Sequence, residues 1–225
     1  STTFNFTTEA DTAPLLVTST PVGVATGISV ATDIVLVFDK NVFAGTGNIS
    51  LYKTTSPGSP HKIVSVTNWR VAGLGTNQIT FNTSGDLTGG SDYYVHVDSG
   101  ALNTAGGTPF AGITDTTTVN FTTADIGAPA LVASTPADGA TDVPVGSDIV
   151  LTFSEAVVAG NPYAGITIHR TSTGTVVETI PVGDLRVTGS GTTTVTINPA
   201  VDLAGGTGYY LNVVTTAFTD PAGNP

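Results

Sequence analysis

The 225-residue sequence contains neither cysteine nor methionine. The lack of cysteine excludes disulfide bonds, thiolate nucleophiles and cysteine-ligated iron–sulfur clusters. The lack of methionine leaves no initiator residue, so we expect a processed or trimmed chain. No apolar run approaches the roughly 20 residues that a membrane-spanning helix requires, and membrane insertion is therefore not expected.

Basic residues are also scarce. Lysine and arginine together number 6 against 17 aspartate and glutamate residues, which gives a formal net charge of −11. The basic residues are scattered singly, whereas nucleic acids and anionic membranes are bound by clusters of them. Nucleic acid is therefore excluded as a partner, and the acidic, Thr- and Gly-rich composition indicates an extracellular location at the cell surface.

Two copies of one sequence unit make up most of the chain. FTTEADTAPLLVTSTP at residues 6–21 returns as FTTADIGAPALVASTP at residues 121–136. DLTGGSDYY at residues 86–94 returns as DLAGGTGYY at residues 202–210. Internal repeats of this size are typical of tandem domain arrays.

Both copies have a β pattern. Short alternating runs rich in Val, Ile and Thr are separated by clusters of Gly, Asn, Asp, Ser and Pro, and no segment sustains a helical period. We predict an all-β fold of two tandem Ig-like β-sandwiches, with domain 1 at residues 13–123 and domain 2 at residues 128–225. The expected strands lie near residues 15–19, 33–38, 48–53, 63–71, 78–82, 92–98 and 117–123 in the first unit, and near 130–134, 148–153, 165–170, 175–182, 184–189, 193–197 and 208–215 in the second.

The two copies are cut out of phase. After ALNTAGGTP at residues 101–109, the first unit continues into a closing strand, TTTVNFTT at residues 116–123. The second unit stops at the corresponding AFTDPAGNP, residues 217–225, while STTFNFTT at residues 1–8 is similar to the closing strand. We therefore expect domain 2 to be incomplete and residues 1–8 to close a neighbouring sandwich.

The second unit carries a family resemblance over its whole length. STPADGATDVPVGSDIVLTFSEAV at residues 134–157, together with residues 202–213 and 217–225, resembles the bacterial Ig-like repeats of S-layer proteins and large surface adhesins. The first unit follows the same template more loosely. The resemblance implies an Ig-like fold and a role as an extracellular spacer, lattice former or stalk module.

The N-terminal segment has the pattern of a donor strand. Side chains alternate along a strand, so Phe4 and Phe6 share one face, and Thr3, Asn5 and Thr7 share the other. A sandwich that lacks a strand exposes apolar core and unpaired backbone groups, which a strand from another molecule can cover. The expected acceptor groove is lined by Leu131, Val132, Tyr210, Leu211 and Val213.

These features predict a structural subunit of a cell-surface filament or lattice, assembled head to tail from copies of the chain by donor-strand complementation. The alternative is a stalk or adhesin fragment of a longer Ig-like array that binds glycan or a surface. Residues 1–8 then belong to a preceding domain. In a third arrangement, these residues fold back onto the second domain of the same chain.

Catalytic motifs do not appear in the sequence. His61, His96 and His169 lack metal-ligand spacing, and no G-x-S-x-G motif is present. The three glutamates form no recurring pair of the kind that glycoside hydrolysis uses. We expect no enzymatic activity, and the sequence assigns no cofactor apart from the calcium considered next.

Acidic loops in the second unit suit calcium, which takes roughly six to eight oxygen ligands. Asp-Gly and Asp-Pro-Ala-Gly are also ordinary turn sequences, so both interpretations stay open. The first unit lacks acidic residues at the aligned positions. The candidate calcium ligands are Asp138, Asp142, Glu155, Asp220 and Asn224, with Asp11 and Asp125 as further candidates near the domain junctions.

Two further features leave partners open. Asn-x-Ser/Thr triplets begin at Asn5, Asn48, Asn82 and Asn120 and allow N-glycosylation. Trp69 and the tyrosine pairs at residues 93–94 and 209–210 suit a glycan platform, but we expect them to fill the core and cover its edge, with one ring of each tyrosine pair facing in and one out.

Overall fold

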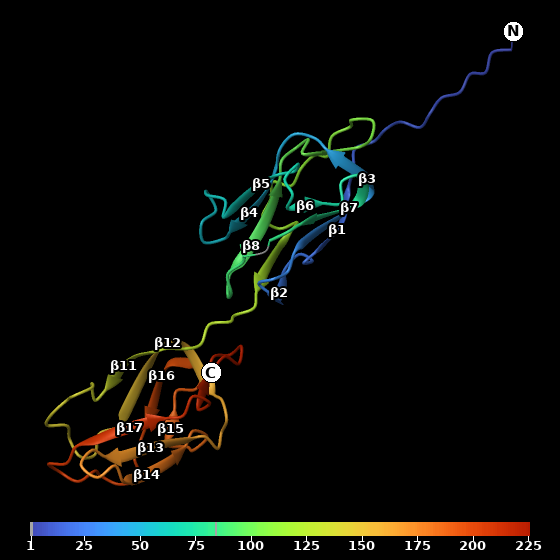
Figure 1. Cartoon of the computed structure of the whole chain (residues 1–225). Helices are drawn as coiled ribbons and strands as arrows, with labels where there is room; N and C mark the ends of the chain where they lie inside the picture. The colour runs from blue at the N-terminus through green and yellow to red at the C-terminus, as the bar shows by residue number, and fades with distance from the viewer. Residues whose placement is uncertain (1, 84) are drawn as a thin grey trace. The chain divides into compact units, whose positions relative to one another are not determined.

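The computed structural model describes residues 2–83 and 85–225, so Ser1 of the expected donor strand lies outside the described residues. The chain divides into two compact units, and the boundary between them falls after Asp125. All regular structure in the described residues is β-strand (Figure 1). Accordingly, no helix in them could span a bilayer. The all-β prediction is confirmed.

Unit 1 contains two sheets. The first has the order β1 (Leu16–Thr20), β3 (Ile34–Ala44), β7 (Thr76–Phe81) and β6 (Val71–Ala72), and β9 (Leu102–Asn103) pairs with β3. The second has the order β2 (Ala25–Ile28), β10 (Asn120–Thr123), β8 (Asp92–Val97), β4 (Asn48–Lys53) and β5 (Lys62–Ser65). The last strand in sequence, β10, thus lies between two others, parallel to β2 and antiparallel to β8.

The closing strand and the segment before it are part of the core of unit 1. Val119 and Phe121 are buried, and the Phe121 ring stacks on Tyr93 with centroids 5.7 Å apart. The preceding Gly-rich segment also buries Phe110 and Ile113. Because each buried side chain of this size contributes about 1.5–3 kcal/mol, removing this segment would strip several contributions from the core.

Unit 2 repeats most of this arrangement. Its first sheet has the order β11 (Leu131–Thr135), β12 (Ile149–Ala159), β16 (Thr192–Ile197) and β15 (Val187–Thr188), and β18 (Phe218–Thr219) pairs with β12. Its second sheet contains only β14 (Val176–Pro181), β13 (Gly165–Arg170) and β17 (Tyr209–Val213). Counterparts of β2 and β10 are missing from residues 126–225, all of which the structure describes.

The segment that corresponds to β2 keeps its local conformation in unit 2. Val24 and Gly27 of unit 1 have φ angles of 58° and 67°. Their counterparts Gly139 and Asp142 have φ angles of 72° and 58°. The turn therefore forms without a partner strand, whereas the β-strand assignment of β2 depends on its pairing with β10.

Candidate functional site

Unit 2 has an open apolar groove where unit 1 is closed. Its counterpart of Phe38 is Phe153, and Phe38 is covered edge-on by Phe110, with ring centroids 5.1 Å apart. The closing segment of unit 1 therefore covers the position that is open beside Phe153. The groove has a volume of about 380 Å³ and is lined by Pro129, Leu131, Leu151, Phe153, Val213, Val214, Thr215, Phe218 and Pro225.

Core positions of unit 1 are partly exposed in unit 2. Tyr93 and Val97 are fully buried in unit 1. In unit 2, the counterpart of Tyr93, Tyr209, is half-buried, and the counterpart of Val97, Val213, is 37% exposed. Leu131 at the other wall is 57% exposed. Removing apolar surface from water contributes about 25 cal/mol per Å². This surface therefore favours an apolar occupant.

Strand β17 is an edge that can accept another strand. It pairs with β13, from Ile166 opposite Val213 to Arg170 opposite Tyr209. Its counterpart in unit 1, β8, has β4 on one side and β10 on the other. The second side of β17 has no strand partner among the described residues. Such an edge presents a row of N–H and C=O groups for β-augmentation.

Some of the expected groove residues lie in the groove and others do not. Leu131 and Val213 line it, and Leu211 packs against the core of unit 2. Val132 is exposed and is not among the lining residues. A register shift at Leu131 interrupts the regular pairing of β11 with β12, so simple alternation did not identify the inward side chains.

The assignment of Tyr210 to the groove is corrected. Its ring stacks on His169, with centroids 4.8 Å apart, on the face of the sheet opposite the core. Tyr209 takes the inward position and packs against the core. Either residue of the pair could have been chosen from sequence, because the local alternation gives no direction.

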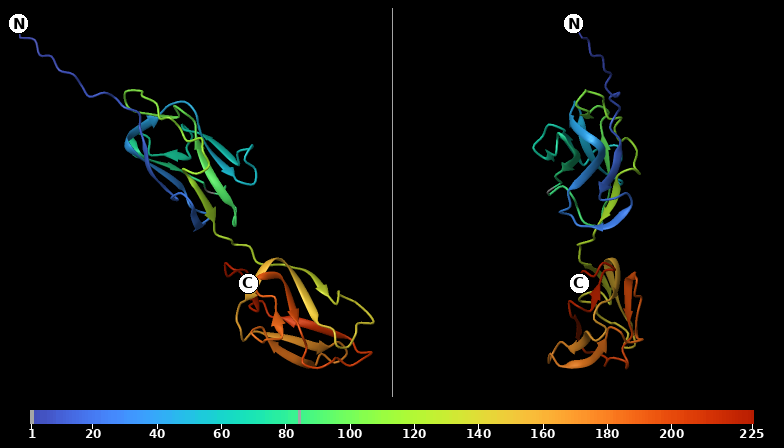
Figure 2. Two further views of the ribbon diagram at one scale, coloured as in Figure 1. Left: turned by 180° about the vertical axis from the view of Figure 1, so that it is seen from behind. Right: turned by 90° about the vertical axis from the view of Figure 1, so that its right-hand side faces the viewer.

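The expected donor strand is extended and exposed. Residues 2–12 lie in no strand, and Figure 2 shows this segment running outward from the strands of unit 1. Phe4 and Phe6 are each 87% exposed. Two large apolar side chains thus lie in water on a segment whose sequence matches the buried closing strand.

Among the candidate calcium ligands, Glu155 and Asp220 come together, with carboxylate oxygens within 4.8 Å of one another. Asp220 is buried and accepts two hydrogen bonds of 2.7 Å from the backbone and side-chain amides of Asn224. Burial acts to raise the pKa of Asp220, but these bonds outweigh it and the pKa is lowered. Asp138 and Asp142 are exposed and lie outside this group. Calcium binding stays a prediction.

In unit 1, the positions that correspond to Glu155 and Asp220 are not acidic. Lys40 and Thr104 occupy the positions of the acidic pair. The carboxylate of Asp11 accepts hydrogen bonds from the hydroxyls of Thr104 at 2.5 Å and Thr108 at 2.7 Å. These bonds, led by the one from Thr104, lower the pKa of Asp11. Protein groups therefore satisfy this carboxylate in unit 1.

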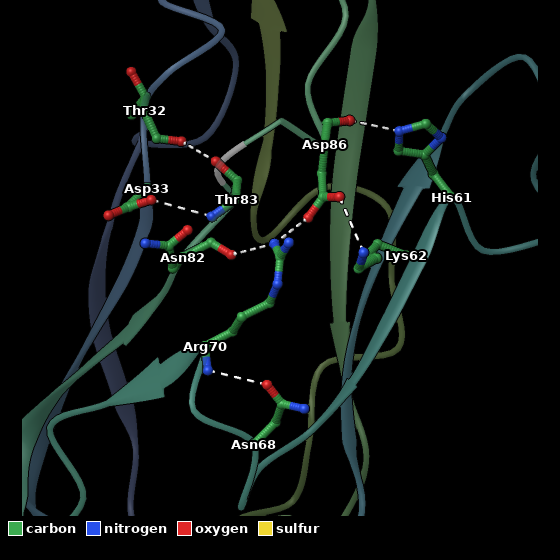
Figure 3. Close-up of polar contacts among 9 residues, drawn as sticks. All are labelled: Thr32, Asp33, His61, Lys62, Asn68, Arg70, Asn82, Thr83 and Asp86. Atoms are coloured by element: carbon green, nitrogen blue, oxygen red, sulfur yellow. Dashed lines mark hydrogen bonds and ion pairs between the residues drawn. The ribbon is translucent and has the colours of Figure 1, made fainter.

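A polar cluster in unit 1 links several of its segments and has a structural role (Figure 3). Asp86 accepts a hydrogen bond of 2.6 Å from Arg70 and lies 3.1 Å from Lys62, while its backbone oxygen contacts His61. Two cations offset the cost of burying this carboxylate. In unit 2, Arg186 takes the place of Arg70 and also pairs with acidic residues. His61 therefore belongs to this structural cluster of unit 1.

Trp69 does not lie in the core, contrary to the expectation. Trp69 is 78% exposed, and the Arg70 guanidinium carbon lies 5.2 Å from the centroid of its ring. Leu185, the counterpart in unit 2, is also exposed. Tyr93 belongs to the core of unit 1, whereas Tyr94 stacks on Tyr52 on the other face of the sheet, with centroids 5.0 Å apart, so one ring faces in and one out. The turn before the arginine thus presents an apolar side chain to solvent in both units.

Comparison with known proteins agrees with this architecture. No curated protein matches the chain. The family model described as a bacterial Ig-like domain matches residues 10–123 and again residues 125–225. These domains are commonly exposed at bacterial surfaces, and their all-β fold is typically non-catalytic. The chain belongs to the bacterial Ig-like domain family and carries two of its domains in tandem.

Proposed function

We propose that the protein is an extracellular structural subunit of a surface filament or lattice, in which unit 2 accepts residues 1–8 of another copy as a β-strand. The observation that carries the proposal is the closing strand of unit 1. In unit 1, β10 lies between β2 and β8. Residues 116–123, which include β10, differ from residues 1–8 only at Thr116, where the N-terminal segment has Ser1, and at Val119, where it has Phe4.

The corresponding position in unit 2 accounts for both phenylalanines of the donor. By analogy with β10, the donor lies antiparallel to β17 with Phe6 at the position of Phe121. The Phe6 ring then covers Tyr209, as the Phe121 ring covers Tyr93. Phe4 takes the position of Val119. Phe153 contacts the ring of Phe218, with centroids 5.6 Å apart, and still lines a groove of about 380 Å³, which suits the larger side chain of Phe4.

Strand donation of this kind propagates. The donor surface and the acceptor surface are different, so the contact is heterologous and builds an open filament unless the rotation closes a ring. The two phenylalanines contribute about 3–6 kcal/mol on burial. New ladder hydrogen bonds add about 1 kcal/mol each. Both gains offset the cost of ordering the segment.

Deletion of residues 1–8 tests the proposal. Electron microscopy and light scattering should show long assemblies of the full chain and monomers of the truncated chain. A synthetic peptide of residues 1–8 should bind the truncated chain at one per molecule, and a peptide with Phe4→Ala and Phe6→Ala is the matched control. Chains of 225 residues that remain monomeric at high concentration, or truncated chains that still assemble, would contradict the proposal.

The array alternative predicts a different outcome. If residues 1–8 close a preceding domain of a longer chain, that longer chain also closes unit 2 with residues beyond Pro225, whereas the 225-residue chain with its open groove still binds the peptide. A chain extended beyond Pro225 by a closing strand would then not bind the peptide. This comparison separates intermolecular donation from a covalent array.

Glycan binding is the second candidate, and the exposed Trp69 ring favours it. Planar aromatic surfaces stack on the apolar faces of sugars, and Arg70 adds hydrogen-bond donors beside the ring. A glycan array with the intact protein tests it, with Trp69→Ala as the variant and Leu185→Ala as the matched control. Binding that survives Trp69→Ala would exclude this surface.

A further inference from the structure

We infer that Asn5 and Thr8 set the register in which the donor strand enters unit 2, as specificity-determining residues for assembly. The inference rests on the proposed strand donation. It concerns a question that the apolar side chains leave unanswered, namely which of two similar alignments the strand adopts.

The phenylalanines alone do not define one register. They are two residues apart, so a slip of two residues keeps the same face toward the core and still places one ring in an inward position. Register is strongly specified only where a slip changes what is buried. Polar side chains with single partners at defined places are therefore needed to exclude the slipped strand.

Unit 1 shows the first of these contacts. The side-chain oxygen of Asn120 accepts a hydrogen bond of 2.7 Å from the backbone N–H of Val24. The backbone oxygen of Asn120 lies 3.0 Å from the same nitrogen. Asn5 is the donor residue at this position, and Gly139 is the counterpart of Val24. Because Gly139 already has the left-handed φ of that turn, its N–H is ready to meet Asn5.

The second contact lies at the other end of the strand. Thr123 is buried, and its hydroxyl donates a hydrogen bond of 2.6 Å to the backbone oxygen of Thr88 and accepts one of 3.0 Å from the backbone N–H of Ser91. Thr8 is the donor residue at this position. Both partners are backbone groups, so the counterparts Ala204 and Thr207 can supply them.

The receiving turn of unit 2 is already in place. The backbone N–H of Ala204 donates to the hydroxyl of Tyr209 at 3.0 Å. The backbone N–H of Thr88 donates to Tyr93 in the same way at 2.9 Å. Unit 2 therefore presents the acceptor geometry for Thr8 before any strand arrives.

A slip of two residues loses both contacts. It places Thr3 or Thr7 at the position of Asn5, and these side chains lack the amide. It also places Phe6 or Ala10 at the position of Thr8, so that a bulky ring or a methyl group replaces the hydroxyl. Buried backbone groups left without a partner are costly, and the slipped strand is therefore disfavoured.

Cysteine cross-linking reads the register directly, because the chain has no cysteine of its own. In unit 1, Thr122 lies opposite Asp92, which maps Thr7 opposite Gly208. A Thr7→Cys chain is mixed with a larger, tagged chain carrying Gly208→Cys, or with one carrying Tyr210→Cys that detects a slip of two residues. Mass-resolved heterodimers report contacts between chains only.

The Gly208→Cys chain should give about tenfold more disulfide-linked heterodimer than the Tyr210→Cys chain, which corresponds to about 1.4 kcal/mol of register preference. Adding Asn5→Leu and Thr8→Val, which keep side-chain size, should reduce this ratio toward one while heterodimers still form. An unchanged ratio in the double variant, or equal yields with Asn5 and Thr8 intact, would overturn the role of these residues. Absence of heterodimer with either acceptor would instead overturn strand donation.

Discussion

At the residue scale, the two repeats provide matched positions for substitution. Phe6 and Phe121 have the same place in the strand template, but Phe121 is buried within unit 1 and Phe6 is exposed. The same change should therefore have different consequences at the two sites. This contrast separates assembly from folding.

Phe6→Ala should weaken assembly by at least a hundredfold and leave the unfolding of unit 1 unchanged. Phe121→Ala should lower the free energy of unfolding of unit 1 by about 3–5 kcal/mol, because it removes a core ring. Sedimentation and denaturant unfolding measure the two effects. A Phe6→Ala chain that assembles as the parent does would contradict the donor assignment.

Acid should weaken unit 1 through Asp115, which precedes β10. Hydrogen bonds from the hydroxyl and backbone N–H of Thr118, and from Thr117, hold the pKa of Asp115 well below its usual range. A depressed carboxyl pKa stabilises the fold above the unfolded-state pKa of about 4, and this stabilisation is lost as pH falls through the folded-state value. Calorimetry from pH 7 to 2 should show a smaller acid loss in Asp115→Asn than in the parent. The exposed Asp138→Asn change in unit 2 is the control, and equal slopes in the two variants would argue against the role of Asp115.

At the element scale, local pattern predicted the strands that depend on local pattern. The strands at residues 48–53 and 165–170 are confirmed with the same bounds. Strand β2 was missed because Ala25–Ile28 contains Gly27 and becomes a strand through pairing with β10, far away in sequence. No strand was expected between residues 98 and 117, and the burial of Phe110 there was not foreseen, since a single apolar residue among glycines has no period.

The acidic pair beside β12 and β18 predicts a response to divalent cations. Glu155 and Asp220 face each other where unit 1 has Lys40 and Thr104, so a cation would relieve like-charge repulsion. Calcium should raise the unfolding temperature of unit 2, and EDTA should reverse the rise. Glu155→Gln should abolish the difference, whereas Asp138→Asn should retain it. An unfolding temperature that does not change with calcium would contradict calcium binding by this pair.

At the scale of the whole molecule, the two units should unfold separately. In the chain without residues 1–8, unit 2 should unfold at the lower temperature, because its core is open beside β17 while that of unit 1 is closed. At a concentration of a hundred times its dissociation constant, the peptide of residues 1–8 should raise the free energy of unfolding of unit 2 by about 2.7 kcal/mol. Only the lower of the two transition temperatures should therefore rise. Differential scanning calorimetry resolves this, and a peptide effect on the upper transition would contradict it.

Sequence alone was enough for the repeat, the all-β class and the likeness of residues 1–8 to the closing strand, because alternation and identity are properties of neighbouring residues. It did not reveal that Tyr209, rather than Tyr210, faces the core, or that Trp69 lies in solvent. Those outcomes depend on the direction in which each strand meets its partners. The full lining of the groove, which includes Leu151, Phe153 and Phe218, likewise appeared only in the tertiary structure, because these residues come from segments that are distant in sequence.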